Sequence, residues 1–155
     1  MRPRNVLKIF SHSRGFAIHL GNHKISEADI EKGIRAFSQD LLIELDRELT
    51  GIFPAAASLL YYFIDSPYAL NTDELTVILK EGCIEDRLVL DVIWFLLYYV
   101  VLGVRADGVT NYIYNFNYDL RVLQIRANRA GIEANYIINP AFWPALSVRT
   151  VDKVQ

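Results

Sequence analysis

The 155-residue sequence contains a single cysteine, Cys83, so no disulfide bond can form within the chain. Unpaired cysteine is typical of proteins that remain in a reducing compartment, where the side chain packs as a small apolar group. The first residues show no basic segment followed by an apolar one, so we expect no signal peptide. We therefore expect a cytoplasmic protein.

The sequence also lacks a strong excess of charge of either sign. The formal net charge is -2 and the isoelectric point is about 5.9, which argues against a general nucleic-acid binder, since such domains tend to be basic. Hydrophobic residues make up 52% of the chain, which is enough for a real core and argues against disorder. The length allows one domain of ordinary size or two small ones.

No apolar run is long enough for a membrane-spanning helix. The longest segment without charge is residues 92–104, and Asp91 and Arg105 bound it closely. A spanning helix needs roughly 20 apolar residues. The pattern favours a buried helix that runs into a strand, and we expect no membrane partner.

Catalytic and metal-binding motifs are missing as well. The chain has no phosphate-binding Gly-Lys-Ser/Thr loop, no HExxH and no paired cysteine motif. His12 and His19 share a helical face but lie two turns apart, too far to hold one metal ion without other ligands. We therefore expect no enzymatic activity, no metal site and no cofactor bound by this chain.

The periodicity predicts a mainly α fold with a small β component. A helix is expected over residues 4–20, with an apolar stripe of Val6, Leu7, Phe10, Ala17 and Ile18, and a second from the Ser26 cap to about Gly51. Shorter helices are expected over 55–64, 72–80 and 85–101. A hairpin turning at Asp107-Gly108 follows, with its second strand over 109–116, then a helix over 118–130 and a strand over 136–138.

This order of elements suggests two parts and a tail. We expect a helical element over residues 1–53 and a second part over residues 54–146, which begins at Pro54. We expect an extended tail over residues 147–155. Three short helices followed by a β-hairpin is the order of a winged helix. We therefore expect a winged-helix-like domain over residues 54–146.

The first part resembles a known element of larger ATPases. Arg2-Pro3-Arg4 heads a helix, a glycine turn follows, and the sequence continues KISEADIEKGIRAFSQDLL. This resembles the C-terminal lid of AAA+ and related P-loop ATPases. The later segments YIYNFNYDLRVL and YIINPAFWPAL are similar to the C-terminal half of bacterial P-loop ATPases of the STAND kind. The resemblance implies a helical lid followed by a winged helix in a protein of signalling or phage defence.

The same resemblance implies roles for particular residues and partners. Arg4 matches the sensor arginine that touches the nucleotide γ-phosphate, with Arg2 as the second candidate. Because the Walker motifs are missing, ATP would be held by a segment upstream or by another chain. The resemblance implies an upstream ATPase core or neighbouring subunits as partners. From the residues alone, both arginines also fit solvated surface charges beside a proline.

A DNA-binding winged-helix regulator is an alternative function. Residues 65–91 carry seven acids against two bases, which would repel duplex phosphates, and the helix predicted after them is apolar all round. Nucleic-acid contact would instead fall on Arg121, Arg126 and Arg129, or on the aromatic face of the strand predicted over 109–116. A solvated helix face and ordinary core packing are the competing interpretations.

A stand-alone protein-interaction module is the other alternative. Trp94 lies in the apolar helix, and Phe142 and Trp143 lie in the compact segment Asn139–Pro144. Tryptophan is enriched at interface hot spots, so these residues are candidates for a partner surface or a homo-oligomer contact. The same residues also fit a cover over the chain's own core.

Overall fold

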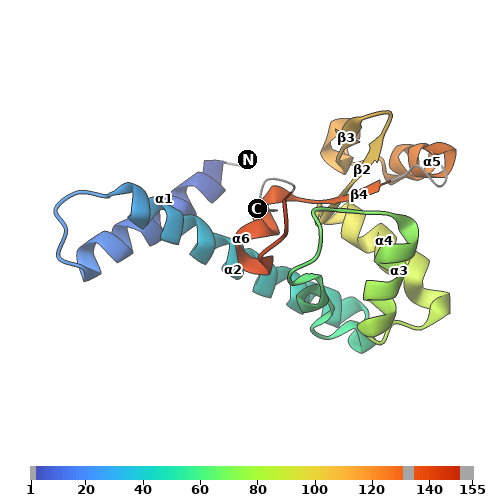
Figure 1. Cartoon of the computed structure of the whole chain (residues 1–155), viewed down its shortest axis with the longest axis horizontal. Helices are drawn as coiled ribbons and strands as arrows, with labels where there is room; N and C mark the ends of the chain where they lie inside the picture. The colour runs from blue at the N-terminus through green and yellow to red at the C-terminus, as the bar shows by residue number, and fades with distance from the viewer. Residues whose placement is uncertain (1–2, 131–134, 151–155) are drawn as a thin grey trace.

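The structure, a computed structural model, describes residues 3–130 and 135–150, and it is mainly helical with a small antiparallel sheet (Figure 1). This confirms the predicted fold class. The elements, with 3₁₀ helices marked η, are α1 (Pro3–His19), α2 (Glu27–Ile52), η1 (Pro54–Ala56), η2 (Leu59–Phe63), β1 (Ala69–Leu70), α3 (Thr72–Glu81), η3 (Asp86–Leu88), α4 (Val89–Tyr98), β2 (Leu102–Ala106), β3 (Val109–Asn111), η4 (Ile113–Phe116), α5 (Leu120–Ala130), β4 (Asn135–Ile138), η6 (Pro140–Phe142) and α6 (Trp143–Leu146).

The first two helices form a hairpin that projects from the rest of the molecule (Figure 1). Gly21 ends the first helix in the left-handed region, with φ of 71°, where a residue without a side chain is favoured. Ser26 then starts α2 through a capping box, in which the side chains and backbone N–H groups of Ser26 and Asp29 bond reciprocally. Both predicted helices are confirmed because these signals are local.

The second half of α2 belongs to the main body. Its leucines Leu42, Leu45 and Leu49 are buried in the core together with η2, α3, α4 and the sheet. The same helix also packs against α1 and α6, and its contacts with α1 extend from Gly33 to Glu44. The division predicted at residue 53 falls just after α2 ends, whereas side chains of α2 enter the main core from Leu42 onward.

The sheet has the order β1-β4-β2-β3, and all its strands are antiparallel to their neighbours. The predicted hairpin is present between β2 and β3, and Asp107 and Gly108 at its turn have φ of 51° and 75°. Two positive φ values match the tight turn that suits strand twist. The last strand, β4, lies between β1 and β2, so residues far apart in the sequence form the centre of the sheet (Figure 1).

Three predicted elements differ from the structure in extent. Residues 55–64 form two 3₁₀ helices instead of one buried helix, and the helix expected over 85–101 is regular only as α4. The strand expected over 109–116 ends at Asn111. There the Asn115 side chain accepts a hydrogen bond of 2.8 Å from the Tyr112 N–H and stabilises a 3₁₀ turn. The alternating aromatic residues therefore do not share a strand face.

The charge-free segment over residues 92–104 runs through α4 into β2, as predicted. Leu96, Leu97 and Leu102 have no exposed surface, so the segment is the centre of the core. Within residues 3–130 and 135–150, no helix combines the length and the hydropathy that a membrane crossing requires. The stretch is apolar because it is enclosed by the other elements of the chain.

Candidate interaction surfaces

Arg4 lies in the first turn of α1, because that helix begins at Pro3. The first turn is where backbone N–H groups lack partners within the helix and where the helix dipole is positive, which suits contact with an anion. The side chain of Arg4 and the whole of Arg2 lie outside the described residues. The two candidate sensor arginines therefore remain predictions.

Small residues bring α1 and α2 into close contact. Ser13 is 1% exposed and lies against Gly33 of the second helix, where a side chain would overlap the Ser13 Oγ. The Ser13 hydroxyl donates to the Ile9 carbonyl oxygen at 2.8 Å, so it is satisfied within its own helix. The two helices are also joined by a hydrogen bond of 2.9 Å between His12 Nε2 and Asp40 Oδ2.

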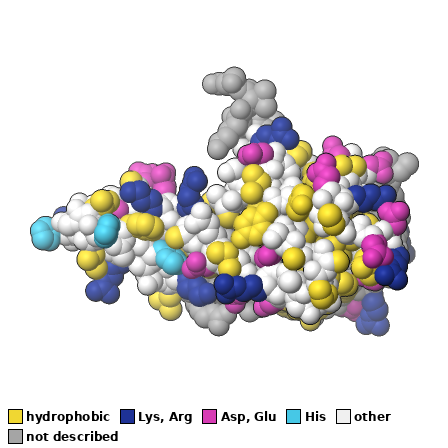
Figure 2. All heavy atoms as spheres, turned by 90° about the horizontal axis from the view of Figure 1, so that it is seen from below, with side chains coloured by type: hydrophobic (Ala, Val, Ile, Leu, Met, Phe, Trp, Pro, Cys, Tyr) yellow, Lys and Arg dark blue, Asp and Glu magenta, His cyan; other side chains and the backbone are white. Residues whose placement is uncertain are grey.

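Most of the apolar stripe predicted for α1 is exposed, although a stripe at helical spacing usually faces a core. Of its five residues only Ala17 is buried, whereas Leu7, Phe10 and Ile18 are 69%, 55% and 62% exposed. The side of α1 that meets α2 near Gly33 instead has Ser13 and Ala17 buried, with Ile9 and Phe16 half-buried. Figure 2 shows hydrophobic side chains at the surface of the hairpin as well as on the main body.

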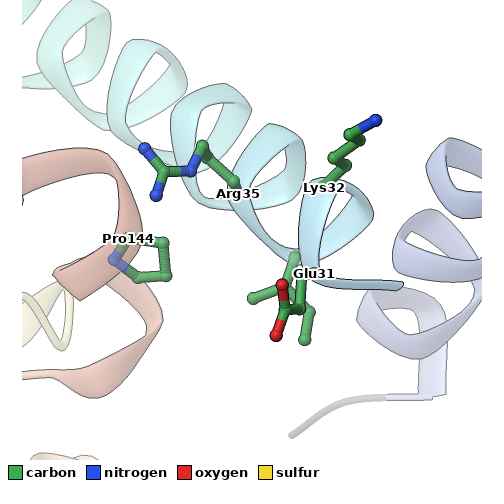
Figure 3. A pocket seen from close by; sticks show the side chains of 5 residues that line it. Glu31, Lys32, Arg35 and Pro144 are labelled. Atoms are coloured by element: carbon green, nitrogen blue, oxygen red, sulfur yellow. The ribbon is translucent and has the colours of Figure 1, made fainter. Parts of the chain in front are cut away.

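A shallow hollow lies between α2 and α6. It has a volume of about 530 Å³ and is lined by Glu31, Lys32, Ile34, Arg35 and Pro144. Figure 3 shows Arg35 extending on the side of the ribbon that carries Pro144, while Lys32 extends away from it. The polar groups of the hollow do not converge on one point, which distinguishes it from an enclosed ligand pocket.

Ser38 joins α2 to η6 and α6 through two hydrogen bonds. Its hydroxyl donates to the Ala141 carbonyl oxygen at 2.7 Å and accepts from the Ala145 N–H at 3.1 Å, and the residue has no exposed surface. Sequence reasoning did not identify Ser38, because a serine inside an amphipathic helix gives no local signal of a partner more than 100 residues away.

The predicted interface residues differ in exposure. Phe142 is 1% exposed and lies in the main core, as the alternative interpretation described. Trp143 is half-buried, and its Nε1–H donates to the Ile138 carbonyl oxygen at 2.8 Å. The ring centres of Trp143 and Tyr68 lie 6.0 Å apart in an edge-to-face arrangement. Trp94 is also half-buried and packs against the core. Both tryptophans keep an accessible part, and their role in an interface remains a prediction.

The three arginines proposed for nucleic-acid contact lie on α5 in different environments. Arg121 forms two hydrogen bonds to the Asp119 carboxylate, at 3.0 and 2.9 Å, and these bonds hold the pKa of Asp119 below its usual value. The guanidinium of Arg126 lies 4.8 Å from the centre of the Phe116 ring. Arg129 is exposed. Phosphate contact by Arg121 would compete with its carboxylate partner, so α5 is not a simple basic surface.

Metal-binding geometry is not found in the described part of the chain. Among residues 3–130 and 135–150, no three histidine, cysteine, aspartate or glutamate side chains are grouped as metal ligands would be.

The first part of the chain matches a known family. Residues 1–46 match the family described as a FunZ-associated C-terminal helical domain. The matched range covers α1 and most of α2, including the Ser13–Gly33 contact. No curated protein and no solved structure matches the chain.

Proposed function

We propose that this chain is the non-catalytic regulatory C-terminal part of a P-loop ATPase of the AAA+ or STAND kind. The match of residues 1–46 to a family described as a C-terminal helical domain supports this proposal, since such a description fits a helical element of a longer protein. The hairpin projects from the body and exposes large apolar side chains, as expected of an element that closes on another domain. Bacterial signalling or phage defence is the setting that the resemblance implies.

In this proposal the hairpin is the lid over a nucleotide held elsewhere. Arg4 would contact the γ-phosphate, since a guanidinium is always charged and offers forked donors to phosphate oxygens. ATP would be bound by an upstream segment or a second chain. Closure of the hairpin would be the ligand-dependent state of a two-state element.

The main body would relay that closure as a winged helix. The order β1, α3, α4, β2 and then β4 between β1 and β2 supports this interpretation. The connection from β2 to β4 carries β3 and α5, in place of a simple wing. Five of the ten residues of α4 are buried, and its surroundings are acidic, which supports a relay between protein parts over DNA reading.

One experiment tests the proposal on its decisive point. The coding sequence before Met1 is read for a P-loop segment in the same or an adjacent frame, and both parts are produced together. ATP turnover is then measured with the wild-type chain and with Arg4→Ala. We expect Arg4→Ala to lower turnover by about 100-fold, the order of effect of losing a donor to transition-state charge. Lys24→Ala, an exposed base in the α1–α2 loop, is the control.

Either of two outcomes would overturn it. Turnover that does not depend on this chain would remove the regulatory role. Tight binding of ATP by this chain alone, measured by calorimetry, would mean that the nucleotide site lies here instead.

A further inference from the structure

The outward face of α1 carries exposed apolar side chains. Leu7, Phe10, Arg14 and Ile18 recur at helical spacing and form one stripe, named here the α1 stripe. All four residues are exposed, whereas Ser13 and Ala17 are buried and Ile9 and Phe16 are half-buried. The hairpin therefore does not use the largest apolar surface of its own first helix.

The charge of α1 limits what can cover this stripe. Between Pro3 and His19 the sequence has three bases, Arg4, Lys8 and Arg14, and no acid. Lys8 and His12 lie beside acids of α2, whereas Arg14 has no ion-pair partner among the described residues. A symmetric contact between two α1 stripes would place two unpaired Arg14 guanidinium groups in one interface with no acid of α1 to pair them, which is unfavourable. An acidic partner with apolar side chains is the complement.

The helices α3 and α4 lie at the other end of the molecule from α1 (Figure 1), and residues 65–91, which include them in part, are acidic. Within residues 65–91, Lys80 and Arg87 are already paired with Asp86 and Glu85, at 2.8 and 2.7 Å. Five further acids have no ion pair within the described part of the chain: Asp65, Asp73, Glu74, Glu81 and Asp91. Of these, Glu74 accepts a hydrogen bond from the Asn71 N–H.

Apolar side chains lie among these acids. Val77, 54% exposed, stands one helical turn from Asp73 and from Glu81, and the three form what we name the α3 stripe. Leu90, 58% exposed, adjoins Asp91 on α4. The surface therefore combines carboxylates with apolar groups, as the α1 stripe combines Arg14 with Leu7 and Phe10.

We propose that the partner is a second copy of this chain, with the α1 stripe of one copy on the α3 stripe of the next. The lengths agree: residues 7–18 span about 17 Å and Thr72–Glu81 about 15 Å. Because the two surfaces differ and lie at opposite ends, the contact is head-to-tail and continues into a ring or an open chain of copies. The proposal concerns this chain's own surfaces and does not depend on an ATPase partner.

The contact is small. Two helices of this length bury less than the roughly 800 Å² per partner of a standard interface, so the association is weak and concentration-dependent. The charges on the two stripes are exposed, so added salt weakens it further.

Sedimentation velocity of the full chain tests the proposal, at concentrations up to about 0.3 mM and at roughly 0.05 and 0.5 M salt. We expect the wild type to associate at low salt and to dissociate at high salt. Leu7→Asp on α1 and Val77→Asp on α3 should each weaken association at least about tenfold. Both side chains are more than half exposed, so the variants should fold, which circular dichroism checks. Val109→Asp, at an exposed valine outside both stripes, should associate as the wild type does.

An equal mixture of the two variants is decisive. One intact α1 stripe then meets one intact α3 stripe, so the mixture should form a dimer and stop there, although each variant alone is monomeric. A mixture that stays monomeric would overturn the head-to-tail contact. A wild-type chain that is monomeric at every concentration and salt would overturn the choice of a second copy as the partner, and so would association lost only in Leu7→Asp.

Discussion

The close contact of α1 and α2 at Gly33 makes a sharp prediction about stability. A methyl group at Gly33 would overlap the Ser13 Oγ and lie 2.9 Å from the Ile9 carbonyl oxygen and 3.0 Å from the Ser13 backbone nitrogen. Overpacking of this kind costs about 1–3 kcal/mol. Against this cost, the higher helix propensity of alanine relative to glycine stabilises a helix by about 1 kcal/mol. Gly33→Ala should therefore lower the free energy of unfolding by about 0–2 kcal/mol.

Gly15→Ala is the matched control that separates the two contributions. Gly15 lies in α1, and a methyl group added there would have no neighbouring atom within 4 Å, so its substitution should stabilise the chain by about 0.5–1 kcal/mol. The difference between the two variants then measures the crowding alone, and we expect about 1–3 kcal/mol. For a chain of this length, each kcal/mol shifts the melting temperature by about 2–4 °C.

Thermal unfolding, monitored by circular dichroism, measures the effect of each substitution on the stability of the whole chain. Amide hydrogen exchange of residues 9–17 measures its effect on α1. We expect Gly33→Ala to lose exchange protection in α1, because that helix packs mainly on α2. Adding Ser13→Ala should recover only part of the loss, since the contacts to backbone atoms remain. If Gly33→Ala stabilised the chain as much as Gly15→Ala does, the crowding at this contact would be disproved.

Three further predictions follow from single contacts. Ser38→Ala should lower the free energy of unfolding by about 1–3 kcal/mol in urea denaturation, because it leaves the Ala141 carbonyl and the Ala145 N–H without their partner, whereas exposed Ser11→Ala should have little effect. Asn71→Ala should cost about 1 kcal/mol by removing the cap of α3, and Asn128→Ala, an exposed asparagine of α5, serves as its comparison. Burial raises the pKa of Tyr112 from 10.0 to about 12, so the unfolded chain loses this proton at lower pH than the folded chain does. The free energy of unfolding should therefore fall as the pH rises from 10 to 12. A spectrophotometric titration in which Tyr112→Phe removed no late-titrating tyrosine would contradict this.

Local chemistry made several elements predictable from the sequence. The caps at Ser26 and Asn71, the glycine at position 21 and the Asp107-Gly108 turn act on their own backbone neighbours, so they set the ends of α2, α3 and α1 and the hairpin wherever these elements lie. The charge-free segment through α4 and β2 was predictable for a related reason. Its length excludes a membrane span and its composition requires burial.

Hydrophobic periodicity alone did not give the correct environment of α1 or the correct structure of residues 112–116. Leu7, Phe10 and Ile18 of α1 have the spacing of a core face, yet they are exposed. The helix turns a different side toward α2, where Ser13 and Ala17 are buried and Ile9 and Phe16 are half-buried. The signal available was the glycine itself, since a glycine inside a helix usually marks close backbone approach. In residues 112–116, alternation suggested a strand, but the Asn115 side chain stabilised a turn instead.

The amino-acid sequence alone was enough to establish where the principal helices begin and the β-hairpin turns, the mainly α class, and the acidic character of residues 65–91. The three-dimensional arrangement was needed to show that β4 lies between β1 and β2, that α2 serves both the hairpin and the core, and that α1 exposes its apolar side. The difference lies in the range of the interactions. A cap or a turn is satisfied within about four residues, whereas a buried face depends on which distant element arrives to cover it.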